Sequence, residues 1–121
     1  MRLNHLGLPV RDGQRSRRFY AEYFGFDPAS AQRYEDGTVI VRNDAGFDLA
    51  LHEVPGEVGP LPEFLHFGFR MPAAADVRAL HARLAAAGVE IVEAHDEPGH
   101  VSFKCLDPDG HRVETYWERP G

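Results

Sequence analysis

Two stretches decide how this chain folds, Asn4-His5-Leu6-Gly7-Leu8-Pro9-Val10 and Leu65-His66-Phe67-Gly68-Phe69-Arg70-Met71. Each has histidine second and glycine fourth, and each alternates in the way that a β-strand with one buried face does. They lie about half the chain apart, and each is followed by a helix-like segment that a glycine, Gly25 or Gly88, is expected to end. The chain therefore reads as two copies of one structural module.

The same order of elements is expected in each copy. The first should contain a strand at 3–10, a helix at 14–24 and strands at 26–34, 38–42 and 47–53. The second should contain a strand at 63–71, a helix at 73–87 and strands at 89–94, 100–106 and 111–117. Residues 55–62 hold three prolines and two glycines and cannot form regular structure. We therefore predict a single domain made of module one (1–54), a linker (55–62) and module two (63–121).

Strand alternation places the two histidines on comparable faces. His5 and His66 each point away from the apolar face that should pack against a helix, and a glycine two residues later leaves room for a ligand. On the last strand, Glu114 also points away from its apolar neighbours. Two imidazoles and one carboxylate form a plausible divalent-metal site. The alternative is that these are strand residues that only make hydrogen bonds.

The bulk composition narrows the function classes. The net charge is −6, which disfavours a nucleic-acid or anionic-membrane surface. The single cysteine, Cys105, excludes an intrachain disulfide and is expected to be a small buried apolar residue. Nothing resembles a signal peptide or a membrane span, so a cytoplasmic location is expected.

Three stretches together resemble the vicinal oxygen chelate superfamily, which includes glyoxalase I, extradiol dioxygenases, fosfomycin-resistance transferases and bleomycin-resistance proteins. They are residues 4–12 with Ser16-Arg17-Arg18-Phe19-Tyr20, residues 65–69, and Leu106-Asp107-Pro108-Asp109-Gly110-His111-Arg112-Val113-Glu114. The resemblance covers nearly the whole chain. It implies an α+β fold in which two βαβββ modules form an open, curved mixed sheet with the helices on its outer face.

The resemblance also implies a ligand set. The metal ligands of the superfamily map onto His5, His66 and Glu114, and Glu114 is also the expected catalytic group. The fourth-strand glutamate that glyoxalase I uses is replaced here by Ala50, with His52 two residues further on the same face. The remaining three-ligand set resembles that of extradiol dioxygenases and fosfomycin-resistance enzymes. Glu97 and Pro98, where the latter carry a potassium-binding loop, count against the fosfomycin group.

The function implied is a divalent-metal-dependent enzyme, using Fe, Mn, Ni or Zn, that acts on a small substrate with vicinal oxygens. The alternative is a bleomycin-resistance-type protein, which would give antibiotic resistance by sequestering a drug or natural product without catalysis. The candidate substrate-binding residues are Tyr116, Arg70, Lys104 and His52. The other histidines, His81, His95, His100 and His111, are expected to face solvent or make local hydrogen bonds, with the last three in or beside turns. A homodimer that binds no nucleic acid and no membrane is expected.

Overall fold

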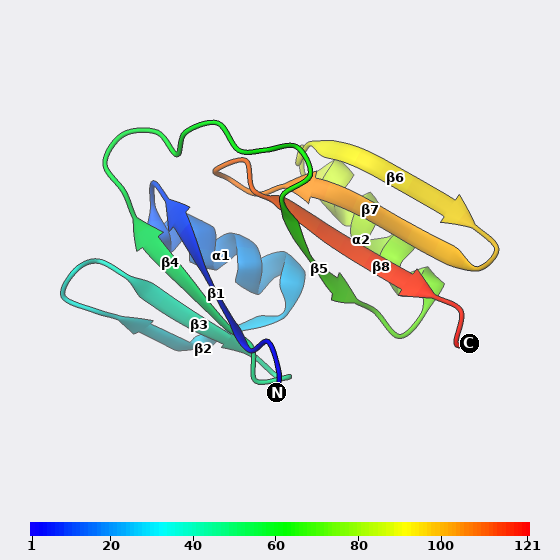
Figure 1. Cartoon of the computed structure of the whole chain (residues 1–121), viewed down its shortest axis with the longest axis horizontal. Helices are drawn as coiled ribbons and strands as arrows, with labels where there is room; N and C mark the ends of the chain where they lie inside the picture. The colour runs from blue at the N-terminus through cyan, green and yellow to red at the C-terminus, as the bar shows by residue number, and fades with distance from the viewer. The chain divides into compact units, whose positions relative to one another are not determined.

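The computed structural model describes residues 1–121, and the chain divides into two compact units, Met1–Pro60 and Leu61–Gly121. The division falls inside the Pro/Gly-rich segment that the sequence predicts to be irregular, and no helix or strand occurs between 54 and 65. These units are module one and module two (Figure 1).

Module one follows the order β1 (His5–Val10), α1 (Gly13–Phe24), β2 (Phe26–Arg33), β3 (Val39–Asn43) and β4 (Asp48–Glu53). Its four strands form one mixed sheet in the order β1-β4-β3-β2, and β1 runs parallel to β4. Module two repeats the plan with β5 (His66–Arg70), α2 (Ala74–Ala86), β6 (Ile91–Glu97), β7 (His100–Leu106) and β8 (Arg112–Glu118). The second sheet has the order β5-β8-β7-β6, with β5 parallel to β8. The predicted βαβββ repeat and fold class are confirmed.

In each module one face of the sheet is buried beneath the helix. In module one the buried strand residues include Leu8, Val10, Leu49 and Leu51, and Tyr20 of α1 is fully buried with them. In module two Val77, Leu80 and Leu84 of α2 are buried with residues of β7 and β8. The opposite face of each sheet carries the polar candidates, as strand alternation requires.

The two helices begin differently. The carboxylate of Asp12 caps α1 by accepting hydrogen bonds from the backbone N–H groups of Gln14 and Arg15, at 3.0 and 3.1 Å. Those bonds, that of Arg15 first, lower the pKa of Asp12 from its usual value of 3.8. Ala73 stands at the start of α2 and provides no side-chain cap. Gly25 and Gly88 follow the helices with φ of 74° and 81°, which confirms both as the predicted stop residues.

The structure corrects the predicted strand ends in module two. The first strand begins at His66 rather than at 63, and β6 continues to Glu97 rather than ending at 94. His95 therefore lies within a strand, because pairing with β7 holds this polar segment extended. Only Pro98 and Gly99 form the turn between β6 and β7.

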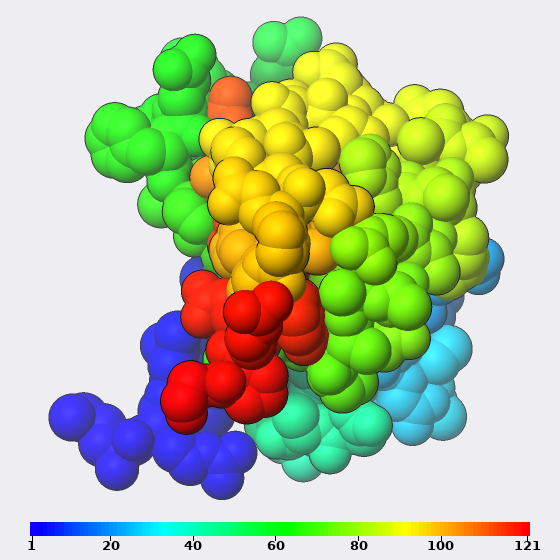
Figure 2. Space-filling model, turned by 90° about the vertical axis from the view of Figure 1, so that its right-hand side faces the viewer, coloured from blue at the N-terminus to red at the C-terminus, as the bar shows by residue number.

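The outer surface of module two shows this hairpin, in yellow and orange, beside α2 in yellow-green (Figure 2). β6 is an edge strand, and all of its residues after Ile91 are exposed. The guanidinium of Arg78 on α2 makes two hydrogen bonds, of 2.8 and 2.9 Å, to the carboxylate of Asp96 on β6. Neither helix is long and apolar enough to cross a membrane.

Candidate metal centre

Module two brings two predicted ligands together. Nε2 of His66 on β5 lies 3.9 Å from Oε1 of Glu114 on β8, and both side chains are partly exposed, by 35% and 23%. Glu114 pairs in register with Gly68, two residues after His66. Parallel pairing of β5 and β8 therefore places an imidazole and a carboxylate side by side on the face away from α2.

The hydrogen bond that Nδ1 of His66 makes leaves Nε2 as the nitrogen that could bind a metal. Its Nδ1 lies 2.8 Å from the backbone oxygen of Phe64. A carbonyl can only accept, so Nδ1 carries the proton and Nε2, which faces Glu114, keeps its lone pair. Metal-binding histidines are oriented by this kind of second hydrogen bond.

His5 repeats this arrangement at the equivalent position of module one. Its Nδ1 lies 2.9 Å from the side-chain oxygen of Asn4. With that oxygen accepting, Nε2 of His5 is again the free nitrogen. Within each module no group of three or more His, Cys, Asp or Glu side chains could hold a metal ion, because module one supplies one of the predicted ligands and module two supplies the other two.

The two glycines make room for neighbouring side chains rather than for a free ligand. A β-carbon added to Gly68 would lie 3.1 Å from Cβ of Glu114 and 3.4 Å from its Oε1. A β-carbon added to Gly7 would lie 3.3 Å from Nε2 of His52. The space that the sequence assigned to a ligand is thus used by a carboxylate in module two and by an imidazole in module one.

Strand register explains why only module two has a carboxylate beside its β-strand glycine. Gly7 pairs with Ala50 on β4 in the same way that Gly68 pairs with Glu114 on β8. Ala50 is therefore the structural equivalent of Glu114, and module one lacks a carboxylate at that point. His52 lies two residues further along β4, opposite Pro9, with its ring over Gly7.

The other predicted lining residues share the face of Glu114 in module two. Arg70 and Tyr116 are paired in register, and Lys104 pairs with Glu114 across β7 and β8. Nη2 of Arg70 donates to the backbone oxygen of Glu118 at 3.1 Å. By strand register these side chains lie on the polar face with Glu114.

Lys104 has an acidic partner that sequence analysis missed. Its Nζ lies 3.1 Å from Oε2 of Glu93 on β6. The hydrogen bond from Lys104 is the main cause that lowers the pKa of the Glu93 carboxyl from its usual 4.5, and the positive charge of the lysine adds to it. Glu93 and Lys104 pair across β6 and β7 just after a register shift in β6, and that irregularity could not be read from alternation alone.

Three further groups, His81, Cys105 and His111, lie on the helix side or beside a turn. The ring of His81 on α2 stacks on Phe103, with centroids 5.0 Å apart. His111 is buried just after the turn at 107–110, and its backbone N–H donates to Oδ1 of Asp107 at 2.9 Å. Cys105 is fully buried, as predicted, and burial raises the pKa of its thiol to about 12. That thiol cannot serve as a nucleophile at neutral pH.

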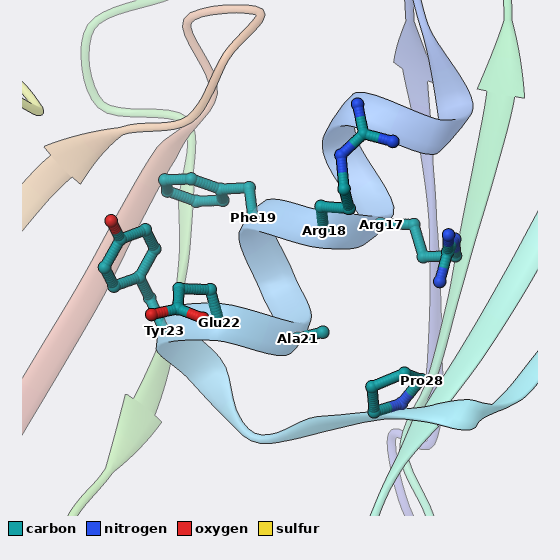
Figure 3. Close-up of a pocket in the computed structure, with 7 residues that line it drawn as sticks. All are labelled: Arg17, Arg18, Phe19, Ala21, Glu22, Tyr23 and Pro28. Atoms are coloured by element: carbon teal, nitrogen blue, oxygen red, sulfur yellow. The ribbon is translucent and has the colours of Figure 1, made fainter.

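Of two surface hollows in module one, one lies away from the predicted site residues and the other lies next to His5. One, of about 500 Å³, lies along α1 between Arg18, Tyr23 and Pro28, and none of the predicted site residues lines it (Figure 3). The other, of about 330 Å³, lies on the polar face of β2 to β4 and includes Ile40 and Asp48. Asp48 pairs in register with His5, so the second hollow adjoins the candidate site.

The model of the Glyoxalase/Bleomycin resistance protein/Dioxygenase superfamily matches residues 2–115. The chain belongs to this superfamily. It is 35% identical over 115 residues to the Glutathione transferase FosA of Serratia marcescens, covering 94% of this chain and 79% of that protein. A member with this name is thus related to the chain despite Glu97 and Pro98, which the sequence analysis counted against the fosfomycin group.

Solved structures of the superfamily share the fold. A possible glyoxalase from Bacillus cereus has 26% identity and a TM-score of 0.76, covering 95% of this chain and 97% of its own. A glyoxalase/bleomycin resistance protein/dioxygenase domain from a Frankia species has 23% identity and a TM-score of 0.82, covering 100% and 94%. The fosfomycin resistance protein FosX of Listeria monocytogenes has 21% identity and a TM-score of 0.79, covering 97% and 93%.

Proposed function

We propose that the protein is a divalent-metal-dependent enzyme that acts on a small substrate through two vicinal oxygens. His5, His66 and Glu114 would hold the metal, with Fe, Mn, Ni and Zn all compatible with a set of two imidazoles and one carboxylate. A bound metal would act as a Lewis acid on the substrate oxygens. The candidate binding side chains around it are Arg70, Lys104, Tyr116 and His52.

The observation that carries this proposal is the orientation of the histidines. Both have Nδ1 occupied by an oxygen acceptor, at 2.8 Å in His66 and 2.9 Å in His5. Both therefore present Nε2 as a lone-pair donor, and Glu114 lies beside one of them. Histidines that serve only as surface residues have no need of this shared arrangement.

The relationship to the Serratia marcescens protein favours one reaction class within this proposal. That relative is named as a glutathione transferase, so glutathione is the first co-substrate to test. Fosfomycin is the first acceptor to test, because FosX of Listeria monocytogenes, which shares the fold, is named as a fosfomycin resistance protein. The tight turn at Pro98 and Gly99 offers no extended loop for a second cation. On the strength of that relative's name, and despite the short turn, we propose transfer of a thiol to a small oxygen-rich acceptor, with fosfomycin as one candidate acceptor.

Metal titration tests the proposal. Isothermal titration of the metal-free protein with Mn²⁺, Ni²⁺ and Zn²⁺ should give one site per chain, weakened more than about 100-fold in His66→Ala and in Glu114→Gln. His81→Gln is the matched control, because His81 stacks on Phe103 on the helix side. Equal binding by all four proteins would overturn the metal-site proposal.

The sequestering alternative predicts a different result. A drug-binding protein of the bleomycin-resistance type should bind its ligand, seen as a rise in Tm, with or without EDTA and without product formation. The net charge of −6 suits a cationic drug. Turnover of fosfomycin with glutathione that EDTA abolishes would instead support the enzyme.

We also propose that the protein is located in the cytoplasm and forms a homodimer.

A further inference from the structure

We propose that module two carries a second ligand site, for a small aromatic carboxylate, in the hollow between α2 and β6. This hollow has a volume of about 190 Å³. It lies on the helix side of the sheet, whereas the candidate metal ligands His66 and Glu114 lie on the opposite face. The second site therefore does not depend on the proposed metal site.

The hollow exists because the helix does not cover the edge strand. α2 packs on β7 and β8, and β6 continues the sheet beyond β7, beside the helix (Figure 2). Ala94 of β6 pairs with the buried Phe103 of β7, so its methyl group points to the helix side and leaves space there unfilled. Val77 and Val101 also line the hollow, with 1% and 3% of their surface exposed, and give it an apolar floor.

The size and the walls of the hollow suit a single ring. An apolar cavity of about 150 Å³ holds a benzene molecule, so about 190 Å³ gives room for a six-membered ring with one small substituent. His81 of α2 supplies a flat wall. Its ring lines the hollow and stacks on Phe103, with centroids 5.0 Å apart and an angle of 24° between the ring planes. An aromatic ligand would extend this stacked pair.

The mouth of the hollow offers hydrogen-bond donors. Arg78 on α2 and Asp96 on β6 both line it, and two hydrogen bonds of 2.8 and 2.9 Å join them. These bonds engage both oxygens of the carboxylate but use only two of the five N–H donors of the guanidinium. The other donors of Arg78 make no bond within the protein, and neither ring nitrogen of His81 makes one.

These features select one class of ligand. The apolar floor and the imidazole wall favour an aromatic body, and the spare guanidinium donors favour a planar carboxylate, which arginine binds in a bidentate way. A cationic ligand would meet the charge of Arg78 at the mouth. Asp96 competes with a bound carboxylate for Arg78, so the ion pair lowers the affinity of the site without closing it.

Titration of the metal-free protein with benzoate tests the site. In ¹H–¹⁵N correlation spectra the shifts should concentrate in residues 77–81, 94–96 and 101–102, with a dissociation constant on the order of 1 mM. Benzyl alcohol and benzylamine are close to benzoate in size, and should bind about threefold and tenfold more weakly because neither carries the anion. Shifts confined to other residues, or equal affinity for the three compounds, would overturn the proposal.

Two variants at the mouth separate ligand binding from a structural role of the ion pair. Arg78→Gln and Asp96→Asn both break that pair, so a purely structural pair would make the two variants alike. A carboxylate site predicts opposite effects. Arg78→Gln should weaken benzoate binding at least about tenfold, and Asp96→Asn should strengthen it about threefold because the guanidinium loses its internal anion. Equal affinities in the two variants would count against the site.

A third variant fills the hollow. Ala94→Leu should abolish benzoate binding, and it should leave the fold intact because Ala94 lies on the exposed edge strand. Ala79→Leu is the matched control, since Ala79 is exposed on α2 and does not line the hollow. Undiminished binding by Ala94→Leu would overturn the proposal. If Ala94→Leu does not fold, as judged by its spectrum and Tm, the opposite effects of the Arg78 and Asp96 variants decide the question.

Discussion

The two modules share a fold but place different side chains over the same glycine. In module two Glu114 lies over Gly68, and in module one His52 lies over Gly7 while Ala50 takes the register position of Glu114. The repeat therefore fixes where a functional side chain can stand without fixing its chemistry. We propose that module two supplies two of the metal ligands, His66 and Glu114, and that module one supplies the third, His5.

The largest effect is expected from mixing two inactive chains. If a dimer builds each site from His5 of one chain and His66 with Glu114 of its partner, co-refolded His5→Ala and Glu114→Gln chains form one intact site. The mixture should then recover about a quarter of the natural metal-binding capacity, since half the dimers are mixed and carry one good site of two. Capacity measured by metal analysis after gel filtration checks this. No recovery would place all three ligands within one chain.

A smaller effect follows from making the modules more alike. Ala50→Glu restores a carboxylate at the position equivalent to Glu114 and would complete a four-ligand set. Metal affinity should rise about tenfold, which is about 1.4 kcal/mol, and substrate turnover should fall because one open position is taken. Titration calorimetry and a turnover assay measure both, with Ala50→Gln as the neutral control. Unchanged affinity would mean that module one does not face the metal.

The two glycines offer a direct comparison of the modules. Gly68→Ala would press a methyl group against Cβ and the backbone oxygen of Glu114, at 3.1 and 3.3 Å, so β8 must move. We expect a loss of about 1–2 kcal/mol in unfolding free energy and weaker metal binding. Gly7→Ala meets only the end of the His52 ring, which can rotate, so stability should change by less than about 0.5 kcal/mol. Urea unfolding of both variants tests this, and equal losses would contradict it.

The smallest effect concerns the helix starts. Ala73→Ser should give α2 the cap that Asp12 gives α1, raising the unfolding free energy by about 0.5–1 kcal/mol.

The Asp12 cap of α1 should lose its stabilising effect in acid. Its pKa is lowered on folding, so its contribution is complete above pH 3.8 and is lost as the pH falls through the folded value. Thermal melts of Ala73→Ser, and of Asp12→Asn between pH 2 and 6, measure the two effects.

The fold, and the sheet face on which the predicted ligands lie, could be predicted from the sequence because successive side chains of a strand point to opposite faces. Once apolar residues identify the buried face, the opposite face of His66 and Glu114 follows, and the structure places them 3.9 Å apart. The extent of β6 was wrong, since Asp96 and Glu97 favour turns and are held extended by β7.

The contacts of His52 could not be predicted for a different reason. Its hydrogen bond to Thr38 depends on the register between β3 and β4, in which Val39 pairs with Leu51. A shift of one residue would send Thr38 to the other face. The predicted ligand space over Gly7 also proved to hold the His52 ring, because local pattern does not show which neighbouring strand approaches a glycine.

The exposed, polar β6 also has a consequence for how this protein behaves when concentrated. An edge strand presents unpaired backbone groups to any other chain that approaches in extended form. Here every residue after Ile91 is exposed, and the strand carries Glu93, Asp96 and Glu97, of which Glu93 and Asp96 are ion-paired with Lys104 and Arg78. A second copy pairing edge to edge would have to crowd these charged side chains and their partners, so the strand resists the intermolecular pairing from which β-aggregates grow.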